Sequence, residues 1–297
     1  MRPTWFLLVP MILSGCGARQ QPSTPQDTVL QRRAEAAQEA FSLERPAEAA
    51  AQYKAALIEA EARDDPKAIG DYGYDLAVAQ LAANQPRQAL ASARLTQREL
   101  ARRGAVAFPA LILAEAVALD RTGARMEADR LAAQVEAGGD PAAAARATFL
   151  RGLIADETGN AAELDAALAR LAHPTSSEER ADVYELAARR YLRAGLFSRA
   201  AAEAAQAVAL RRTALDYRGM ARGLAMQAAA VAGEGNRPEA ANLYMQAGQS
   251  AAAQGDAGSA RSWVHQALAL DHGPALRQAA RQTLAEMATK PGGAGGQ

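Results

Sequence analysis

A helix-period pattern that is broken by a glycine turn, and then recurs, constrains this chain more than any other feature. Between residues 181 and 214, Tyr184, Ala188 and Tyr191 follow one another at spacings of four and three, so they share one helix face. Gly195 ends that helix, because glycine adopts a positive φ without steric cost. Small side chains on a second helical stretch then face back across the turn: Ala200, Ala204 and Ala207. The stretch predicts two antiparallel helices in close contact.

The order of large and small residues in this stretch resembles the tetratricopeptide repeat. The matching residues are Tyr184, Ala188, Tyr191, Gly195, Phe197, Ala200 and Ala207. Ala204 departs from the pattern, because an aromatic residue is usual there, and no proline follows near the end. The resemblance implies stacked helical hairpins whose first helices line a concave groove, where a peptide or partner protein would bind.

Similar hairpins recur along the chain, with Gly, Pro, Asn or Asp between them. The other predicted pairs are residues 27–43 with 46–63, 66–83 with 86–103, 105–121 with 125–137, a pair between 141 and 171, a pair around 224–247, and 255–270 with 274–288. The phase of the last pair is ambiguous, because its first helix could also complete the sixth unit. We expect an all-α, helical-hairpin solenoid of about seven helix pairs over residues 27–289, in which each hairpin packs against its neighbours. A non-repeating α-bundle is the competing fold.

Composition agrees with an all-α chain. Of the 297 residues, 49 % are hydrophobic but only 5 % are aromatic, so the core must consist mainly of Ala and Leu, which are good helix formers. The formal net charge is zero, and no basic surface favours nucleic acid. Arg87, Arg94, Arg98 and Arg102 form one stripe, which is typical of a solvated helix face or of a surface for an acidic partner.

The first residues predict the cellular location. Arg2 precedes an apolar run from residue 5 to residue 13, which is shorter than the about 20 residues that span a bilayer and fits a secretory signal. Leu13-Ser14-Gly15-Cys16 follows, and this segment resembles the lipobox of bacterial lipoproteins. The resemblance implies cleavage before Cys16, the only cysteine, with acyl chains on its thiol and on the new amino terminus.

Four segments are therefore expected: a signal peptide (1–15), a lipidated cysteine with a flexible tether (16–26), the solenoid (27–289) and a disordered tail (290–297). Gly17, rather than Asp, follows the cysteine. By the same resemblance, this favours an outer-membrane anchor in a bacterial envelope, with the folded part facing the periplasm.

No residue cluster predicts a reaction, a metal or a cofactor. The three histidines, His173, His265 and His272, lack the further ligands that a zinc site needs. Gly233-Glu234-Gly235 does not continue into a dinucleotide-binding motif, and no nucleophile-elbow or P-loop motif occurs. We expect no catalytic residue and no small-molecule substrate.

The function expected is binding. In the family that the repeats resemble, the first helix of each pair lines the groove. The corresponding positions here are Asp71, Tyr74, Arg146, Phe149, Glu185, Arg189, Arg222 and Met226. An error of one residue in the register would turn each side chain by about 100° around its helix.

Three functions follow from this sequence. The first is a membrane-anchored scaffold that holds a peptide segment or partner subunit, in the assembly of a pilus, a secretion channel or outer-membrane machinery. The second is a regulator of peptidoglycan or its synthases. The third is an enzyme that resembles the helical part of a lytic transglycosylase, although the chain lacks a lysozyme-like domain.

Overall fold

The computed structural model describes residues 25–43 and 45–289, and these residues form fourteen α-helices without a strand. The helices are α1 (Pro25–Ser42), α2 (Pro46–Ala62), α3 (Pro66–Ala82), α4 (Pro86–Arg102), α5 (Pro109–Arg121), α6 (Arg125–Glu136), α7 (Pro141–Thr158), α8 (Ala161–Arg170), α9 (Ser177–Arg193), α10 (Phe197–Thr213), α11 (Tyr217–Gly233), α12 (Arg237–Ala253), α13 (Ala257–Leu270) and α14 (Pro274–Thr289). The lipobox, its cysteine, most of the tether and the tail lie outside the described residues.

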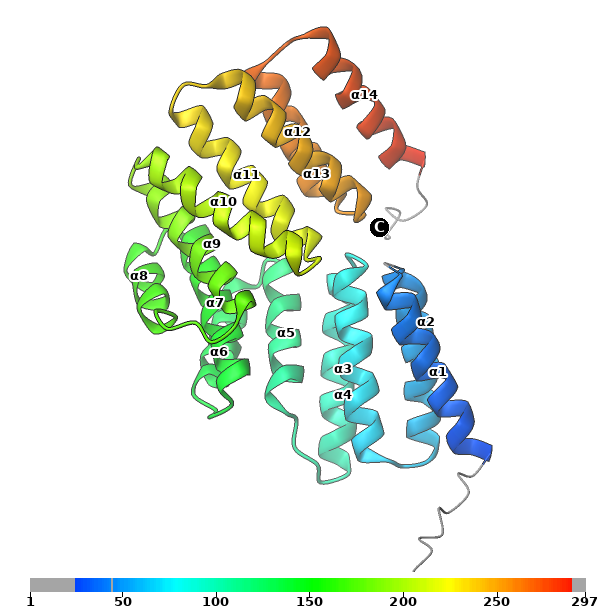
Figure 1. The fold of residues 1–297 in the computed structure, drawn as a ribbon. Coiled ribbons are helices and arrows are strands. Elements are labelled where there is room, and N and C mark those ends of the chain that lie inside the picture. The colour runs from blue at the N-terminus through cyan, green and yellow to red at the C-terminus, as the bar shows by residue number, and fades with distance from the viewer. Residues whose placement is uncertain (1–24, 44, 290–297) are drawn as a thin grey trace, which may run out of the picture.

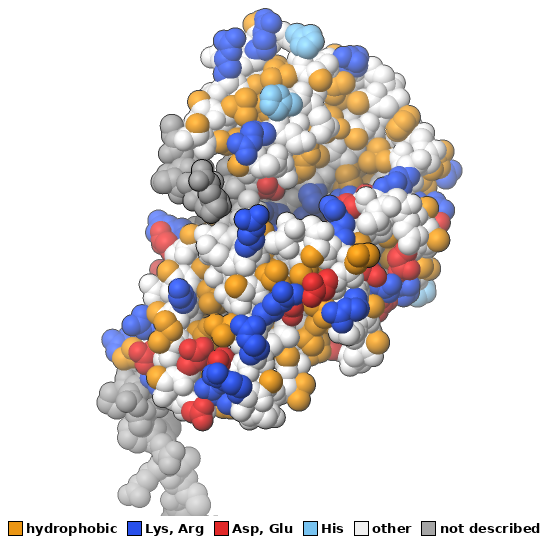
Figure 2. All heavy atoms as spheres, turned by 180° about the vertical axis from the view of Figure 1, so that it is seen from behind, with side chains coloured by type: hydrophobic (Ala, Val, Ile, Leu, Met, Phe, Trp, Pro, Cys, Tyr) orange, Lys and Arg blue, Asp and Glu red, His pale blue; other side chains and the backbone are white. Residues whose placement is uncertain are grey.

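The predicted all-α helical-hairpin solenoid is confirmed. Helices that follow one another in the chain pack together, and the first helices of successive pairs also touch one another from α3 to α11. Figure 1 shows that the stack bends into an arc, with α1–α6 on one side and α9–α14 on the other. Seen from behind, the molecule is hollowed between these two parts, and charged side chains lie in the hollow (Figure 2). The fold is therefore a curved, TPR-like stack rather than a non-repeating bundle.

The turns follow from local chemistry. Gly159 and Gly195 end α7 and α9 with φ values of 77° and 69°, which glycine adopts without strain. Asp140 caps α7, because its Oδ1 accepts hydrogen bonds from the amides of Ala142 (3.0 Å) and Ala143 (3.2 Å). Pro141 then stands at the first helical position, where its missing N–H costs no intrahelical hydrogen bond.

Two helices begin at residues other than those predicted, and the structure settles how the last helices pair. The helix expected from residue 105 begins at Pro109, and residues 105–108 are not helical. Proline disfavours helical backbone in the residue before it, and Phe108 is accordingly extended, with φ −89° and ψ 159°. Pro25 starts α1 inside the segment expected to be tether. The ambiguous phase is resolved, since α12 completes the sixth pair and α13 with α14 forms the seventh.

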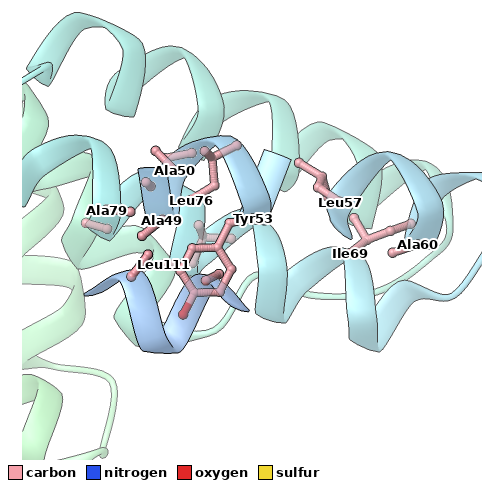
Figure 3. Packing of buried hydrophobic residues seen from close by; sticks show 14 of the residues in the cluster. Ala49, Ala50, Tyr53, Leu57, Ala60, Ile69, Leu76, Ala79 and Leu111 are labelled. Carbon is pink, nitrogen blue, oxygen red and sulfur yellow. The ribbon is translucent and has the colours of Figure 1, made fainter. Parts of the chain in front are cut away.

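The core consists largely of small residues, as the composition predicts. On α10, Ala200, Ala204 and Ala207 are at most 1 % exposed. Figure 3 shows the N-terminal cluster, where Tyr53 and Leu76 fill the space that the alanines around them leave. Small side chains thus set a short distance between helices, and a few large ones fill each layer.

No described helix is long and apolar enough to cross a membrane.

Candidate functional site

The concave side of the arc encloses a cavity of about 880 Å³. Its lining comes mainly from the first helices of the pairs, α3, α5, α7, α9, α11 and α13, together with the turn between α3 and α4 and the end of α12. This placement matches the expectation that first helices line the groove. A volume of this size accommodates a small ligand or a few residues of a peptide.

One wall of the cavity is apolar. Leu113 and Val117 on α5 face the same space as Leu150 and Leu153 on α7, and the indole of Trp263 lines it from α13. Nearer to α3, the rings of Tyr74 and Phe108 pack edge to face with their centroids 5.7 Å apart, so Tyr74 is held in place. The wall offers contact area to apolar side chains of a ligand.

The turn between α3 and α4 meets the start of α11 and the turn between α12 and α13 beside the cavity, and we call this contact the seam. The seam consists of two hydrogen-bonding side chains: Arg218 on α11 and Asn84 after α3. Arg218 Nη2 donates to the carbonyl oxygens of Ala82 (2.7 Å) and Gln254 (3.3 Å), and Asn84 Nδ2 donates to that of Gly255 (3.3 Å). Arg218 and Ala82 are 136 positions apart in the sequence, and Asn84 and Gly255 are 171 positions apart. The seam therefore closes the arc around the cavity.

Arginines supply most of the positive charge in the cavity. Arg121 Nη1 donates to the carbonyl oxygen of Leu81 at 2.8 Å. Partial desolvation by the neighbouring protein, and secondarily the like charges of Arg218 and Arg222, lower its pKa to about 10. Burial also lowers the pKa of Arg218. Both side chains remain positively charged at neutral pH.

A buried ion-pair network supports the base of the cavity. Glu185 on α9 is 1 % exposed, and its carboxylate contacts Arg222 at 2.8 Å, Arg189 at 3.3 Å and Arg211 at 3.5 Å. Burial alone would raise the pKa of Glu185, but the guanidiniums, Arg222 first, outweigh burial and lower this pKa. The network links α9, α10 and α11, and it fixes the two arginines, Arg189 and Arg222, that also line the cavity.

Five of the eight predicted groove residues line the cavity. They are Tyr74, Arg146, Phe149, Arg189 and Arg222.

The other three predicted residues do not line it. Asp71 is exposed and pairs with Lys67 at 2.6 Å. Glu185 is covered by the arginines of the buried network. Met226 is 7 % exposed and packs against Ala188 and Ala204, so it belongs to the contact of α11 with α9 and α10.

The arginine stripe on α4 is divided between two roles. Arg94 contacts Glu115 and Glu127, each at 2.7 Å, and so joins α4 to α5 and α6. Arg102 pairs with Glu99 at 2.6 Å on its own helix. Arg87 and Arg98 are exposed, which fits the solvated-face interpretation for this part of the stripe.

Among the described residues, no group of three or more His, Cys, Asp or Glu side chains could hold a metal ion.

Two solved structures are similar to this chain. One is the crystal structure of a tetratricopeptide repeat protein from Parabacteroides merdae ATCC 43184, with 15 % identity and a TM-score of 0.48, covering 88 % of this chain and 100 % of that one. The other is the complex of the TPR2AB domain of yeast Sti1 with pHSP90, with 16 % identity and a TM-score of 0.37, covering 88 % of this chain and 99 % of that one.

No protein-family profile matches the chain. No curated protein matches it either.

Proposed function

We propose that this protein is a scaffold of the bacterial envelope that holds a peptide segment of a partner protein in its concave cavity. The observation that carries the proposal is the cavity itself, which combines an apolar wall with charged side chains on a rigid helical frame. A peptide needs both features, because its side chains bury apolar area while its polar groups require hydrogen-bonding partners.

The frame also favours binding without a large rearrangement. Arg189 contacts Asp156 at 2.8 Å as well as Glu185, so its guanidinium is oriented before any ligand arrives. Arg222 is held by Glu185 in the same way. Side chains that are already fixed lose little conformational entropy on binding.

Photo-crosslinking in living cells tests this function. A photoreactive amino acid is placed at Tyr74 or Phe149, which line the cavity, and at Arg98, which is exposed on α4. We expect the two cavity positions to crosslink the same protein, through the same peptide region, and the Arg98 position not to do so. Mass spectrometry of the crosslinked peptides identifies that region.

Two outcomes would contradict the scaffold function. In the first, both cavity positions give no crosslink although the protein is folded and abundant. In the second, the Arg98 position captures the same partner as efficiently, so the cavity has no special part in binding.

We further propose that the scaffold is tethered to the outer membrane through acyl chains on Cys16, so that the solenoid faces the periplasm. The lipobox-like sequence before Cys16 supports this proposal. Several acyl chains on one residue would make the attachment stable, whereas one chain binds only marginally.

Inhibition of lipoprotein signal peptidase with globomycin tests the tether. We expect an unprocessed precursor to accumulate, and Cys16→Ser to abolish both lipid labelling and membrane fractionation. Normal processing in the presence of globomycin would rule out the lipid anchor, whereas the cavity proposal would be unaffected.

A further inference from the structure

The cavity has an apolar middle and a charged end. Arg121 at the end of α5 contacts Leu81 at the end of α3, so these two helices run in the same direction. Arg125, four residues later, pairs with Glu157 at the end of α7, which places α7 parallel to them. Before these ends, each helix turns two apolar side chains into the cavity: Val78 and Leu81 on α3, Leu113 and Val117 on α5, and Leu150 and Leu153 on α7. Leu113 precedes Arg121 by eight residues, so the apolar wall extends about 12 Å from the charged end.

Two arginines stand side by side at the charged end. Arg121 donates to the carbonyl oxygen of Leu81 at 2.8 Å, and Arg218 donates to that of the next residue, Ala82, at 2.7 Å. Within the described residues, neither arginine makes an ion pair with a carboxylate. A guanidinium has five N–H donors, and the hydrogen bonds to carbonyls use one nitrogen of each arginine. Both side chains therefore keep donors and positive charge for a further acceptor.

The acids around these two arginines are engaged elsewhere or are hard to ionise. Asp216 caps α11 by accepting from the amide of Gly219 at 2.8 Å, and Asp256 caps α13 by accepting from that of Ser259 at 3.2 Å. Burial raises the pKa of Asp120, which disfavours its charged form. The protein thus compensates the positive charge at this end only in part.

A phosphate monoester fits this charge better than a carboxylate does. After desolvation, the like charges of Arg218 and Arg222 lower the pKa of Arg121, so an anion among the three would relieve repulsion. A phosphate monoester carries a charge of about −1.5 to −2 at pH 7 and has three acceptor oxygens, so two guanidiniums from different helices can share it. A carboxylate has one charge, and its two oxygens match the fork of a single guanidinium.

The remaining space suits an alkyl chain. The apolar wall leads away from the charged end along α5 and α7, and the indole of Trp263 lines the same cavity from α13. The volume of about 880 Å³ lies within the range of about 300–1,000 Å³ that is typical of small-molecule sites. A ligand that carries an anionic head on an apolar chain would therefore use both parts of the cavity at once.

We propose that the cavity binds a single-chain amphiphile with a phosphomonoester head, whose phosphate lies between Arg121 and Arg218 and whose chain lies along α5 and α7. This inference goes beyond the proposed scaffold function and does not depend on it. Because the chain would cover the apolar wall, a bound amphiphile would compete with a peptide for the cavity.

Isothermal titration calorimetry with the purified full chain tests the site. The probes are dodecyl phosphate, octyl phosphate, dodecanoate and inorganic phosphate, each below the concentration at which it forms micelles. We expect dodecyl phosphate to bind most tightly. Octyl phosphate should bind about tenfold more weakly or worse, because it buries fewer methylene groups. Dodecanoate should also bind about tenfold more weakly, because it lacks the second charge and the third oxygen.

Variants locate the two parts of the ligand. Arg121→Gln and Arg218→Gln should each weaken dodecyl phosphate about tenfold or more, because each removes charge-assisted hydrogen bonds. Arg121→Lys keeps the charge without the planar fork and should recover part of the affinity. Arg121→Gln leaves the seam intact, so its effect does not depend on closure of the arc.

A matched control separates the site from general damage. Arg98→Gln removes an exposed arginine outside the cavity and should bind dodecyl phosphate like the wild type. Each variant is compared with the wild type by circular dichroism and thermal unfolding before binding is measured.

Three outcomes would overturn the proposal. If inorganic phosphate binds as tightly as dodecyl phosphate, the site takes free phosphate and the chain has no place in it. If dodecanoate binds as tightly and both Gln variants retain full affinity, the two arginines do not hold a phosphate. If none of the probes binds, the amphiphile site is wrong. In all three cases crosslinking of a partner from Tyr74 and Phe149 would still support the scaffold function, so the two proposals fail separately.

Discussion

At the scale of single residues, the carboxylate of Glu185 holds three neighbouring arginine side chains together. It is 1 % exposed and lies within ion-pair distance of three guanidiniums. We expect Glu185→Gln to lower the free energy of unfolding by about 3–5 kcal/mol, because Arg222 loses its carboxylate partner and Arg189 and Arg211 each lose one of theirs. Urea denaturation followed by circular dichroism measures this change.

Glu178→Gln provides the matched comparison. Glu178 also pairs with a cavity arginine, Arg146, but both side chains are well exposed, at 59 % and 63 %. Surface pairs contribute about 0–1 kcal/mol, so this variant should unfold almost like the wild type. Equal effects of the two substitutions would show that burial of Glu185 does not set the importance of its ion pairs.

The raised pKa of Asp75 predicts that the free energy of unfolding falls as pH rises, whereas a salt-bridged acid has the opposite effect. Burial, and then the charge of Asp71, raise its pKa to about 6 from an ordinary value of 3.8. Between these two values the folded state binds more protons at Asp75 than the unfolded state does. Its contribution to stability is therefore full below about pH 4 and is lost as pH rises through 6.

We expect Asp75→Asn to raise the free energy of unfolding at pH 7 by on the order of 1–2 kcal/mol, and to leave it nearly unchanged at pH 4. Chemical denaturation of wild type and variant at several pH values measures the difference. Asp165→Asn, at a half-exposed acid that pairs with Arg190, serves as the control and should not reproduce this profile. A gain that is the same at both pH values would exclude titration of Asp75 as the cause.

At the scale of helices, glycine sets how closely α3 and α4 approach. A Cβ atom on Gly73 would lie 2.1 Å from Oγ1 and 2.4 Å from Cγ2 of Thr96, which is 1 % exposed. Alanine is the better helix former by about 1 kcal/mol, but overpacking a filled contact costs about 1–3 kcal/mol. We expect Gly73→Ala to destabilise the protein, as measured by a lower midpoint of urea unfolding.

Gly258→Ala tests the same change where space is free. The nearest atom to a Cβ at Gly258 is Asp256 Oδ1 at 3.7 Å. Helix propensity alone should then decide the result, and this variant should equal or exceed the wild type in stability. If Gly73→Ala is also neutral, the two helices can separate without cost and the close contact is not important.

The helix pairs could be predicted from the sequence because each turn carries a local signal. Gly195 or Asp140-Pro141 acts through the backbone of its own neighbourhood, so no distant residue is needed to read it. The helix pattern alone places the start of α5 at residue 105, because it does not include the effect of Pro109, which disfavours helical backbone at Phe108.

The burial of a side chain was harder to predict from the sequence than the position of the helix that carries it. Glu185 and Arg189 are one turn apart, yet only Arg189 lines the cavity. Arg211 from α10 and Arg222 from α11 cover Glu185, and a pattern within α9 contains no information on these helices. Burial depends on how neighbouring helices are rotated, which a single-helix register does not specify.

At the scale of the whole molecule, closure of the arc had no sequence signal. The seam joins residues 136 and 171 positions apart, and the curvature that brings them together accumulates from small rotations between successive pairs. Arg121 and Arg218 could therefore not be recognised as neighbours from a repeat pattern, because they do not occupy equivalent places in their pairs. Only the assembled arc brings both into one cavity.

The seam predicts a change of shape when it is removed. In a solenoid, each pair is held by its neighbours, so loss of the seam should open the arc without unfolding it. We expect the double variant Asn84→Ala/Arg218→Ala to have a larger radius of gyration in small-angle X-ray scattering, with an unchanged helical circular dichroism spectrum. Arg237→Ala is the matched control, since Arg237 also donates to a carbonyl near a helix end, that of Ala269 at 3.0 Å, but over only 32 residues. If the double variant and the control scatter alike, contacts other than these two side chains hold the arc closed.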